Sequence, residues 1–158
     1  MQKFFANAIV FIATGALSLS PFALPLQARS EQTRKSCETA IADGTSRIKN
    51  GREITVTTDI TDRGEIYPNH PSGRSLFVGI VLDGNAADSV MLSPVLQKAI
   101  SSEIISSCDS VGAVTFGRYR TDWSSTFGLM QNGTIKQFEC VDPDPDENKP
   151  RWGQQVCV

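Results

Sequence analysis

The spacing of apolar and polar positions between Leu92 and Met130 predicts a helix followed by a strand. Beyond Ser93-Pro94, which has an N-cap residue before a first-turn proline, apolar residues recur three or four positions apart. They are Val95, Leu96, Ala99, Ile100, Ile104, Ile105 and Cys108. The opposite, water-facing side is assigned Gln97, Lys98, Ser101, Ser102 and Ser106. From Val111 to Tyr119 the period becomes two, which predicts a strand beneath this helix.

The segment before Leu92 contains another helix and two strands. Residues 31–49 place Cys37, Ala40, Ile41, Gly44 and Ile48 on one helical face, and Asn50-Gly51 supplies a stop signal. Residues 53–61 alternate, with Ile54, Val56, Thr58 and Ile60 on the dry face of a strand. Residues 62–74 hold two prolines and two glycines and form a loop. Residues 76–82 are almost continuously apolar, which is typical of a strand covered on both faces.

The pair Asn132-Gly133 predicts a hairpin with a two-residue type I′ turn, because both residues tolerate positive φ. This turn would pair Met130 with Ile135 and Phe127 with Phe138. One face of the hairpin would then carry Trp123, Phe127, Leu129, Phe138 and Cys140.

The order of elements is α-β-β-α-β-β-β, which predicts a single α+β domain. We expect an antiparallel sheet of about five strands with two helices packed on one face. The domain covers residues 29–158, and residues 140–158 form an acidic, proline-rich tail closed by a disulfide.

The first 28 residues have the pattern of a cleavable export signal: Lys3, an apolar run from Phe4 to Leu19, and the small residue Ala28 at the expected cleavage position. A retained membrane anchor is the alternative, but the run is marginal for spanning a bilayer and prolines follow it. After cleavage no membrane association is expected.

Four cysteines in an exported chain predict two disulfides. Cys37 with Cys108, and Cys140 with Cys157, is the favoured pairing. The first two lie on the apolar faces of the two helices, and the last two flank one polar loop. Spacing alone leaves the other two pairings open.

The net charge argues against a nucleic-acid partner, and no sequence motif indicates a cofactor. With 15 basic and 17 acidic residues, the net charge of −2 gives no basic excess for nucleic acid. Neither a phosphate-binding glycine loop nor a cysteine set with zinc spacing is present. Asp142, Asp144, Asp146 and Glu147 are weak calcium candidates, since the glycine and the bidentate glutamate of an EF-hand are missing.

His70 is the only histidine and the weak candidate for a catalytic base, with Ser72 or Asp62 near it in sequence. No nucleophile motif accompanies it. His70 and Arg74 in the loop, with Arg118, Arg120 and Trp123 at a strand end, are the candidate ligand- or partner-binding residues. The two strand-end arginines share a face, so they suit an anion, or they pair with neighbours such as Glu139. Trp152 is expected to fasten the tail onto the body.

The export signal, together with residues 50–76 (NGREITVTTDITDRGEIYPNHPSGRSL) and 93–123 (SPVLQKAISSEIISSCDSVGAVTFGRYRTDW), is similar to small exported proteins of cyanobacteria to which no function is assigned. The resemblance implies export and no particular activity. The residues themselves favour a non-catalytic exported domain that binds a protein or a small ligand. The alternatives are a small extracytoplasmic hydrolase that uses His70 with an acidic partner, and a calcium-stabilised module.

Overall fold

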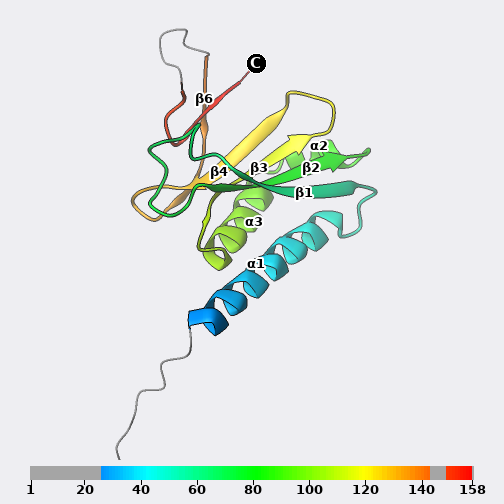
Figure 1. Cartoon of the computed structure of the whole chain (residues 1–158). Helices are drawn as coiled ribbons and strands as arrows, with labels where there is room; N and C mark the ends of the chain where they lie inside the picture. Colours follow the sequence, from blue (N-terminus) through cyan, green and yellow to red (C-terminus); the bar gives the residue numbers. More distant parts are fainter. Residues whose placement is uncertain (1–25, 143–148, 158) are drawn as a thin grey trace, which may run out of the picture.

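The apolar strand β2 (Leu76–Asp83) lies between β1 (Thr55–Asp62) and β3 (Val111–Arg118) in the computed structural model, which describes residues 26–142 and 149–157 (Figure 1). β4 (Ser124–Leu129) and β5 (Ile135–Gln137) complete a sheet with the order β1-β2-β3-β4-β5. The α+β class, the single domain and the five strands are confirmed. β2 and β3 run parallel, however, so the sheet is mixed rather than fully antiparallel. The helical crossover between these strands returns the chain to the starting end of the sheet, which makes them parallel.

Helices α1 (Leu26–Lys49) and α3 (Pro94–Ser107) lie on the same side of the sheet and pack against each other (Figure 1). A short helix, α2 (Ala87–Met91), precedes α3. Between the helices and the sheet lies the main core, which includes Ile48, Val78, Ile80, Leu82, Ile100, Ile104, Val114, Phe116 and Phe127. The two predicted helices on one face are therefore confirmed.

The buried side of α3 differs in part from the predicted one. Val95 is 80% exposed and Ala99 is also exposed, whereas Gln97 is 1% exposed and Ser101 is fully buried. The helix is thus rotated about its axis relative to the predicted orientation. Both buried polar side chains are hydrogen-bonded: the Gln97 amide donates to Val90 O and Met91 O, and Ser101 Oγ donates to Gln97 O. The prediction that Gln97 and Ser101 face water was therefore wrong. Polar side chains can be buried at little cost in free energy when their polar atoms are hydrogen-bonded.

The predicted hairpin register is wrong by one residue. Leu129 lies opposite Ile135, and Phe127 opposite Gln137. The Met130 N–H donates to Thr134 O and only Gly133 adopts positive φ, so the connection is longer than a type I′ turn. The side chain of Asn132 accepts hydrogen bonds from the Thr134 N–H and hydroxyl, which stabilises this loop. Phe127 and Leu129 consequently face the helices, while Phe138 belongs to the other face.

The C-terminal segment covers part of the sheet face that the helices leave open. Its strands β6 (Glu139–Val141) and β7 (Gln154–Val156) pair in parallel. Trp152 packs against Tyr67, Phe77 and Phe138, with ring centroids 5.2–5.7 Å apart, and its indole N–H donates to Leu129 O at 2.8 Å. Trp152 therefore fastens the tail to the body, as expected.

Both predicted disulfides are confirmed: Cys37 is bonded to Cys108 and Cys140 to Cys157. The first ties α1 to the end of α3, and the second closes the tail onto β6.

The dry face predicted for residues 53–61 is only half correct. Ile54 and Val56 pack against the core, but Thr58 is exposed and Ile60 is 54% exposed.

Candidate binding hollow on the open face of the sheet

A hollow of about 270 Å³ lies on the open face of the sheet, beside the tail. Its floor comes from β2, β3 and β4, one wall from the loop after β1, and the other wall from the C-terminal segment. We call it the open-face hollow. It is lined by Arg63, Ile66, Tyr67, Phe77, Thr115, Ser124, Thr126, Pro150, Gln155 and Val156.

Two threonines form the polar part of the floor. Thr115 of β3 and Thr126 of β4 lie directly opposite each other, and their hydroxyl oxygens are 3.0 Å apart. Side chains alternate along a strand, so the neighbours Val114, Phe116 and Phe127 point into the helix-covered core instead. Each hydroxyl keeps spare hydrogen-bonding capacity, because a hydroxyl has one donor and two acceptor positions.

Gln155 of β7 contributes an acceptor without a partner. The residue is 7% exposed, and its Oε1 is the only buried side-chain nitrogen or oxygen among the described residues that makes no hydrogen bond. The amide nitrogen lies near Ser124 O at 3.4 Å and near the Cys157 sulfur at 3.4 Å. A carbonyl oxygen can only accept a hydrogen bond, so the amide nitrogen of Gln155, and not its oxygen, must face Ser124 O. In this orientation Oε1 is left without a partner. Leaving such an acceptor buried costs about 1–3 kcal/mol.

The loop wall combines a cation with aromatic surface. The guanidinium of Arg63 lies over the Phe77 ring, 5.5 Å from its centroid. Tyr67 stacks on Phe77, and its hydroxyl donates to Gln154 O at 3.0 Å. Burial raises the pKa of Tyr67, an effect that the charge of Arg63 partly offsets. The neutral phenol therefore ties the loop to β7 while Arg63 remains available to a ligand.

His70 belongs to the same loop but not to the lining of the hollow. Its Nδ1 lies 2.8 Å from Pro71 O, and its ring meets Trp152 edge-on. Among the described residues, no carboxylate or hydroxyl is hydrogen-bonded to His70. Asp62 instead accepts hydrogen bonds from the Gly64 N–H and the Ser75 hydroxyl, which lower the pKa of its carboxyl group, with a smaller effect from the His70 charge.

The side chain of Arg74 is hydrogen-bonded within the chain. Arg74 Nη1 is within hydrogen-bond distance of three carbonyl oxygens, those of Ile105 and Cys108 at the end of α3 and that of Val111 at the start of β3. Its guanidinium therefore satisfies a helix C-terminus.

The strand-end arginines also have intramolecular partners. Arg118 pairs with Asp88 of α2, rather than with the suggested Glu139, and Arg120 lies over the Tyr119 ring in a turn with φ of 58°. Trp123 is exposed at the same end of the sheet. Neither these residues nor His70 belong to the lining of the open-face hollow.

The acidic residues of the tail lie mostly outside the part of the chain that the structure describes. Asp142 is exposed, whereas Asp144, Asp146 and Glu147 lie outside the described residues. Within residues 26–142 and 149–157, no group of three or more histidine, cysteine, aspartate or glutamate side chains could hold a metal ion.

The sequence pointed to the loop but not to the hollow. Arg63 and Tyr67 fall in the predicted loop, yet nothing in the sequence distinguishes Thr115, Thr126 or Gln155 from other polar positions. Their proximity depends on the sheet register and on where the disulfide fixes the tail.

Comparison with known proteins gives no relative: no family model matches the chain, and no curated protein or solved structure matches it. The resemblance to exported cyanobacterial proteins stays a prediction. Two disulfides suggest an oxidising, extracytoplasmic setting. In the part of the chain that the structure describes, no helix has the length and apolarity needed to span a membrane.

Proposed function

We propose that this protein is a non-catalytic binding module, exported to the periplasm or secreted, whose open-face hollow holds a small ligand. The ligand would carry a carboxylate or another anionic group together with an N–H donor. The unsatisfied Gln155 Oε1 carries the proposal: Gln155 lines the hollow, and a buried acceptor without a partner gains a hydrogen bond when a donor reaches it.

The other groups of the hollow fit the same ligand. Arg63 supplies a fixed positive charge and a planar set of donors suited to a carboxylate. The two floor threonines add hydroxyls, and Phe77 and Tyr67 supply an apolar wall. A few polar groups on an apolar surface are typical of small-molecule sites. The volume is at the small end of such sites, so the ligand is expected to have the size of an acylated amino acid.

The hydrolase hypothesis has less support. A general base must be within hydrogen-bond reach of the group that it activates, directly or through one water. The His70 ring contacts a backbone carbonyl and the edge of an indole ring, and its interaction with Asp62 is electrostatic, without a hydrogen bond among the described residues.

Titration with N-acetyl amino acids of increasing side-chain size tests the proposal. The side-chain amide signal of Gln155 in a ¹⁵N-correlated NMR spectrum should shift on binding. N-acetylglycinamide lacks the carboxylate and acetate lacks the N–H, so both should bind more weakly than N-acetylglycine. An unmoved Gln155 signal throughout the series would refute the hollow as the site.

Variants separate the two recognition elements. Arg63→Gln should weaken binding of the N-acetyl amino acids but affect N-acetylglycinamide little, because only the former carry the carboxylate. Gln155→Met should weaken both, because both donate an N–H. Arg120→Gln, which removes an arginine outside the lining of the hollow, is the matched control and should leave binding unchanged.

Export has its own test. The mature protein is expected to begin at Arg29, after removal of the first 28 residues, and intact mass measurement of protein from its own cells would show this. A mass that corresponds to the full chain would support the anchor alternative instead.

A further inference from the structure

The outer edge of β1 is open for pairing. β1 is the first strand of the sheet, and no described segment pairs with its outer edge. It is eight residues long, runs against β2 without a register shift, and contains neither proline nor lysine. The opposite edge strand, β5, has three residues and includes Lys136. Short length, charged side chains, proline and bulges are the usual protection of edge strands. β5 is short and carries Lys136, whereas the longer β1 is charged only at Asp59 and at its last residue, Asp62.

The register identifies which backbone groups of β1 are available. The Arg63 N–H donates to Ser75 O, and in antiparallel pairs such bonded positions alternate. Odd-numbered residues of β1 therefore bond to β2. Val56, Thr58 and Ile60 direct their N–H and C=O groups away from the sheet, in the spacing that an added strand requires.

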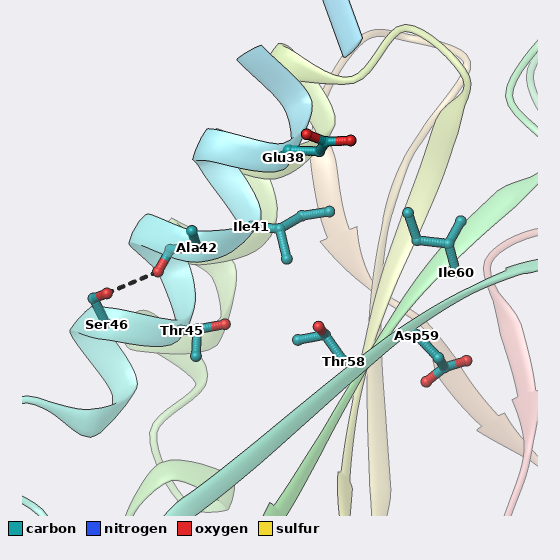
Figure 2. A pocket seen from close by; sticks show the side chains of 8 residues that line it. All are labelled: Glu38, Ile41, Ala42, Thr45, Ser46, Thr58, Asp59 and Ile60. Atoms are coloured by element: carbon teal, nitrogen blue, oxygen red, sulfur yellow. Dashed lines mark hydrogen bonds between the residues drawn. The ribbon is translucent and has the colours of Figure 1, made fainter. Parts of the chain in front are cut away.

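Next to this edge lies a cleft of about 590 Å³ between α1 and β1. Figure 2 shows Ile41 and Thr45 directed from α1 toward β1, and Thr58 directed back toward the helix. Ile60 lies at the same edge and remains 54% exposed. The helix side of the cleft is mixed: Ile41 and Ala42 are apolar, whereas Glu38, Thr45 and Ser46 are polar. Apolar contact for a sixth strand therefore comes mainly from Ile41 and Ile60.

Charge indicates what kind of strand fits. Asp59 lines the cleft and is turned to the other side of the strand (Figure 2). Its carboxylate accepts a hydrogen bond from the Thr61 hydroxyl, and among the described residues no basic side chain forms an ion pair with it. Edge pairing of two copies around a twofold axis would place both Asp59 carboxylates on the same side of one strand pair. Like charges there are unfavourable.

We propose that the outer edge of β1 receives an extended segment of a partner protein in which apolar and basic residues alternate. Backbone bonds form with Val56, Thr58 and Ile60. Apolar side chains of the segment rest against Ile41 and Ile60, and its basic side chains face the Asp59 side. This site is separate from the open-face hollow and does not depend on the function proposed for that hollow.

Hydrogen exchange by NMR tests the proposal with a short capped peptide of alternating valine and lysine. In the free protein, the amides of Val56, Thr58 and Ile60 should exchange faster than those of Thr57 and Asp59. Saturating peptide should slow the fast set by about tenfold. The same peptide with glutamate in place of lysine should have a much weaker effect.

Two variants probe the backbone and the charge separately. Thr58→Pro removes an outward N–H, which edge strands tolerate, and should abolish peptide protection of Val56 and Ile60. Asp59→Lys should reverse the preference toward the glutamate peptide. Its matched control is Asp122→Lys, an exposed aspartate away from β1, which should retain the lysine preference.

Three results would overturn the proposal. The first is a failure of both peptides to slow the exchange of Val56, Thr58 and Ile60. The second is an Asp59→Lys protein that still prefers the lysine peptide. The third is slow exchange of these amides in the free protein. Concentration-dependent slow exchange would assign the edge to a second copy, and concentration-independent slow exchange to another segment of this chain.

Discussion

Gln97 of α3 accepts a hydrogen bond from the Ser125 hydroxyl of β4 at 2.8 Å, inside the core. The same side chain donates to Val90 O at 3.1 Å and to Met91 O at 3.2 Å. One amide therefore joins α2, α3 and β4 where the helices meet the sheet. A buried side chain with all its polar atoms bonded fixes the relative position of the elements that it connects.

Gln97→Ala is expected to lower the free energy of unfolding by about 2–4 kcal/mol. The substitution leaves a cavity and also deprives the Ser125 hydroxyl and two carbonyl groups of their partner. Denaturant unfolding followed by circular dichroism would measure the change. Lys98→Ala, on the exposed side of the same helix, should change stability by less than about 0.5 kcal/mol. Equal effects of the two variants would contradict this assignment of the buried face.

The sequence predicted the elements of the fold better than their orientation. The apolar spacing located α3 because most of its buried positions, such as Ile100 and Ile104, are aliphatic. The same spacing could not show that Gln97 is buried, since that depends on partners contributed by α2 and β4. Likewise, Asn132-Gly133 correctly marked a turn between two strands. The longer loop, stabilised by the Asn132 side chain, then set a different register.

The candidate site was less predictable than the fold. The loop that carries Arg63 was recognisable by its prolines and glycines, and the cysteines indicated that the tail is closed by a disulfide. Gln155 became distinctive only because the parallel pairing of β7 with β6 buries it beside the Cys140–Cys157 disulfide. No local sequence signal encodes that proximity.

Removing the two disulfides separately should give different losses of stability. By the loop-entropy estimate, Cys37→Ala/Cys108→Ala should cost about 4 kcal/mol and Cys140→Ala/Cys157→Ala about 3 kcal/mol, because the closed loops differ in length. The cysteines are 71 and 17 positions apart. Chemical denaturation of both variants measures these values.

The smaller disulfide also has an expected local effect. Loss of Cys140–Cys157 should release the tail and move the fluorescence of Trp152 to longer wavelength under native conditions. The helix–helix disulfide variant should leave that emission unchanged. Unaltered Trp152 emission without the tail disulfide would mean that the aromatic contacts alone hold the tail.

Alkaline pH should destabilise the protein through Tyr67. Burial raises the folded-state pKa of Tyr67 above its ordinary value of 10.0. Above about pH 10 the unfolded chain loses this proton while the folded protein keeps it, so stability falls as pH rises toward the folded-state pKa. Tyr67→Phe should remove this part of the decline, although it loses the bond to Gln154 O at every pH. Melting temperatures between pH 8 and pH 11 measure the difference, and parallel declines in both proteins would refute it.

Gly128 and Gly117, on adjacent strands, provide a matched test of the aromatic packing beneath the tail. A β-carbon at Gly128 would overlap the Phe138 ring, with Cζ at 2.9 Å, and would lie 3.3 Å from the Trp152 ring. At Gly117 a β-carbon would meet nothing within 4 Å. Gly128→Ala should therefore cost about 1–3 kcal/mol, because the rings must shift. Gly117→Ala should be neutral or slightly stabilising, since alanine restricts the unfolded chain. Denaturant unfolding of both variants measures the contrast. A Gly128→Ala protein as stable as the Gly117→Ala protein would mean that Phe138 and Trp152 do not press against β4.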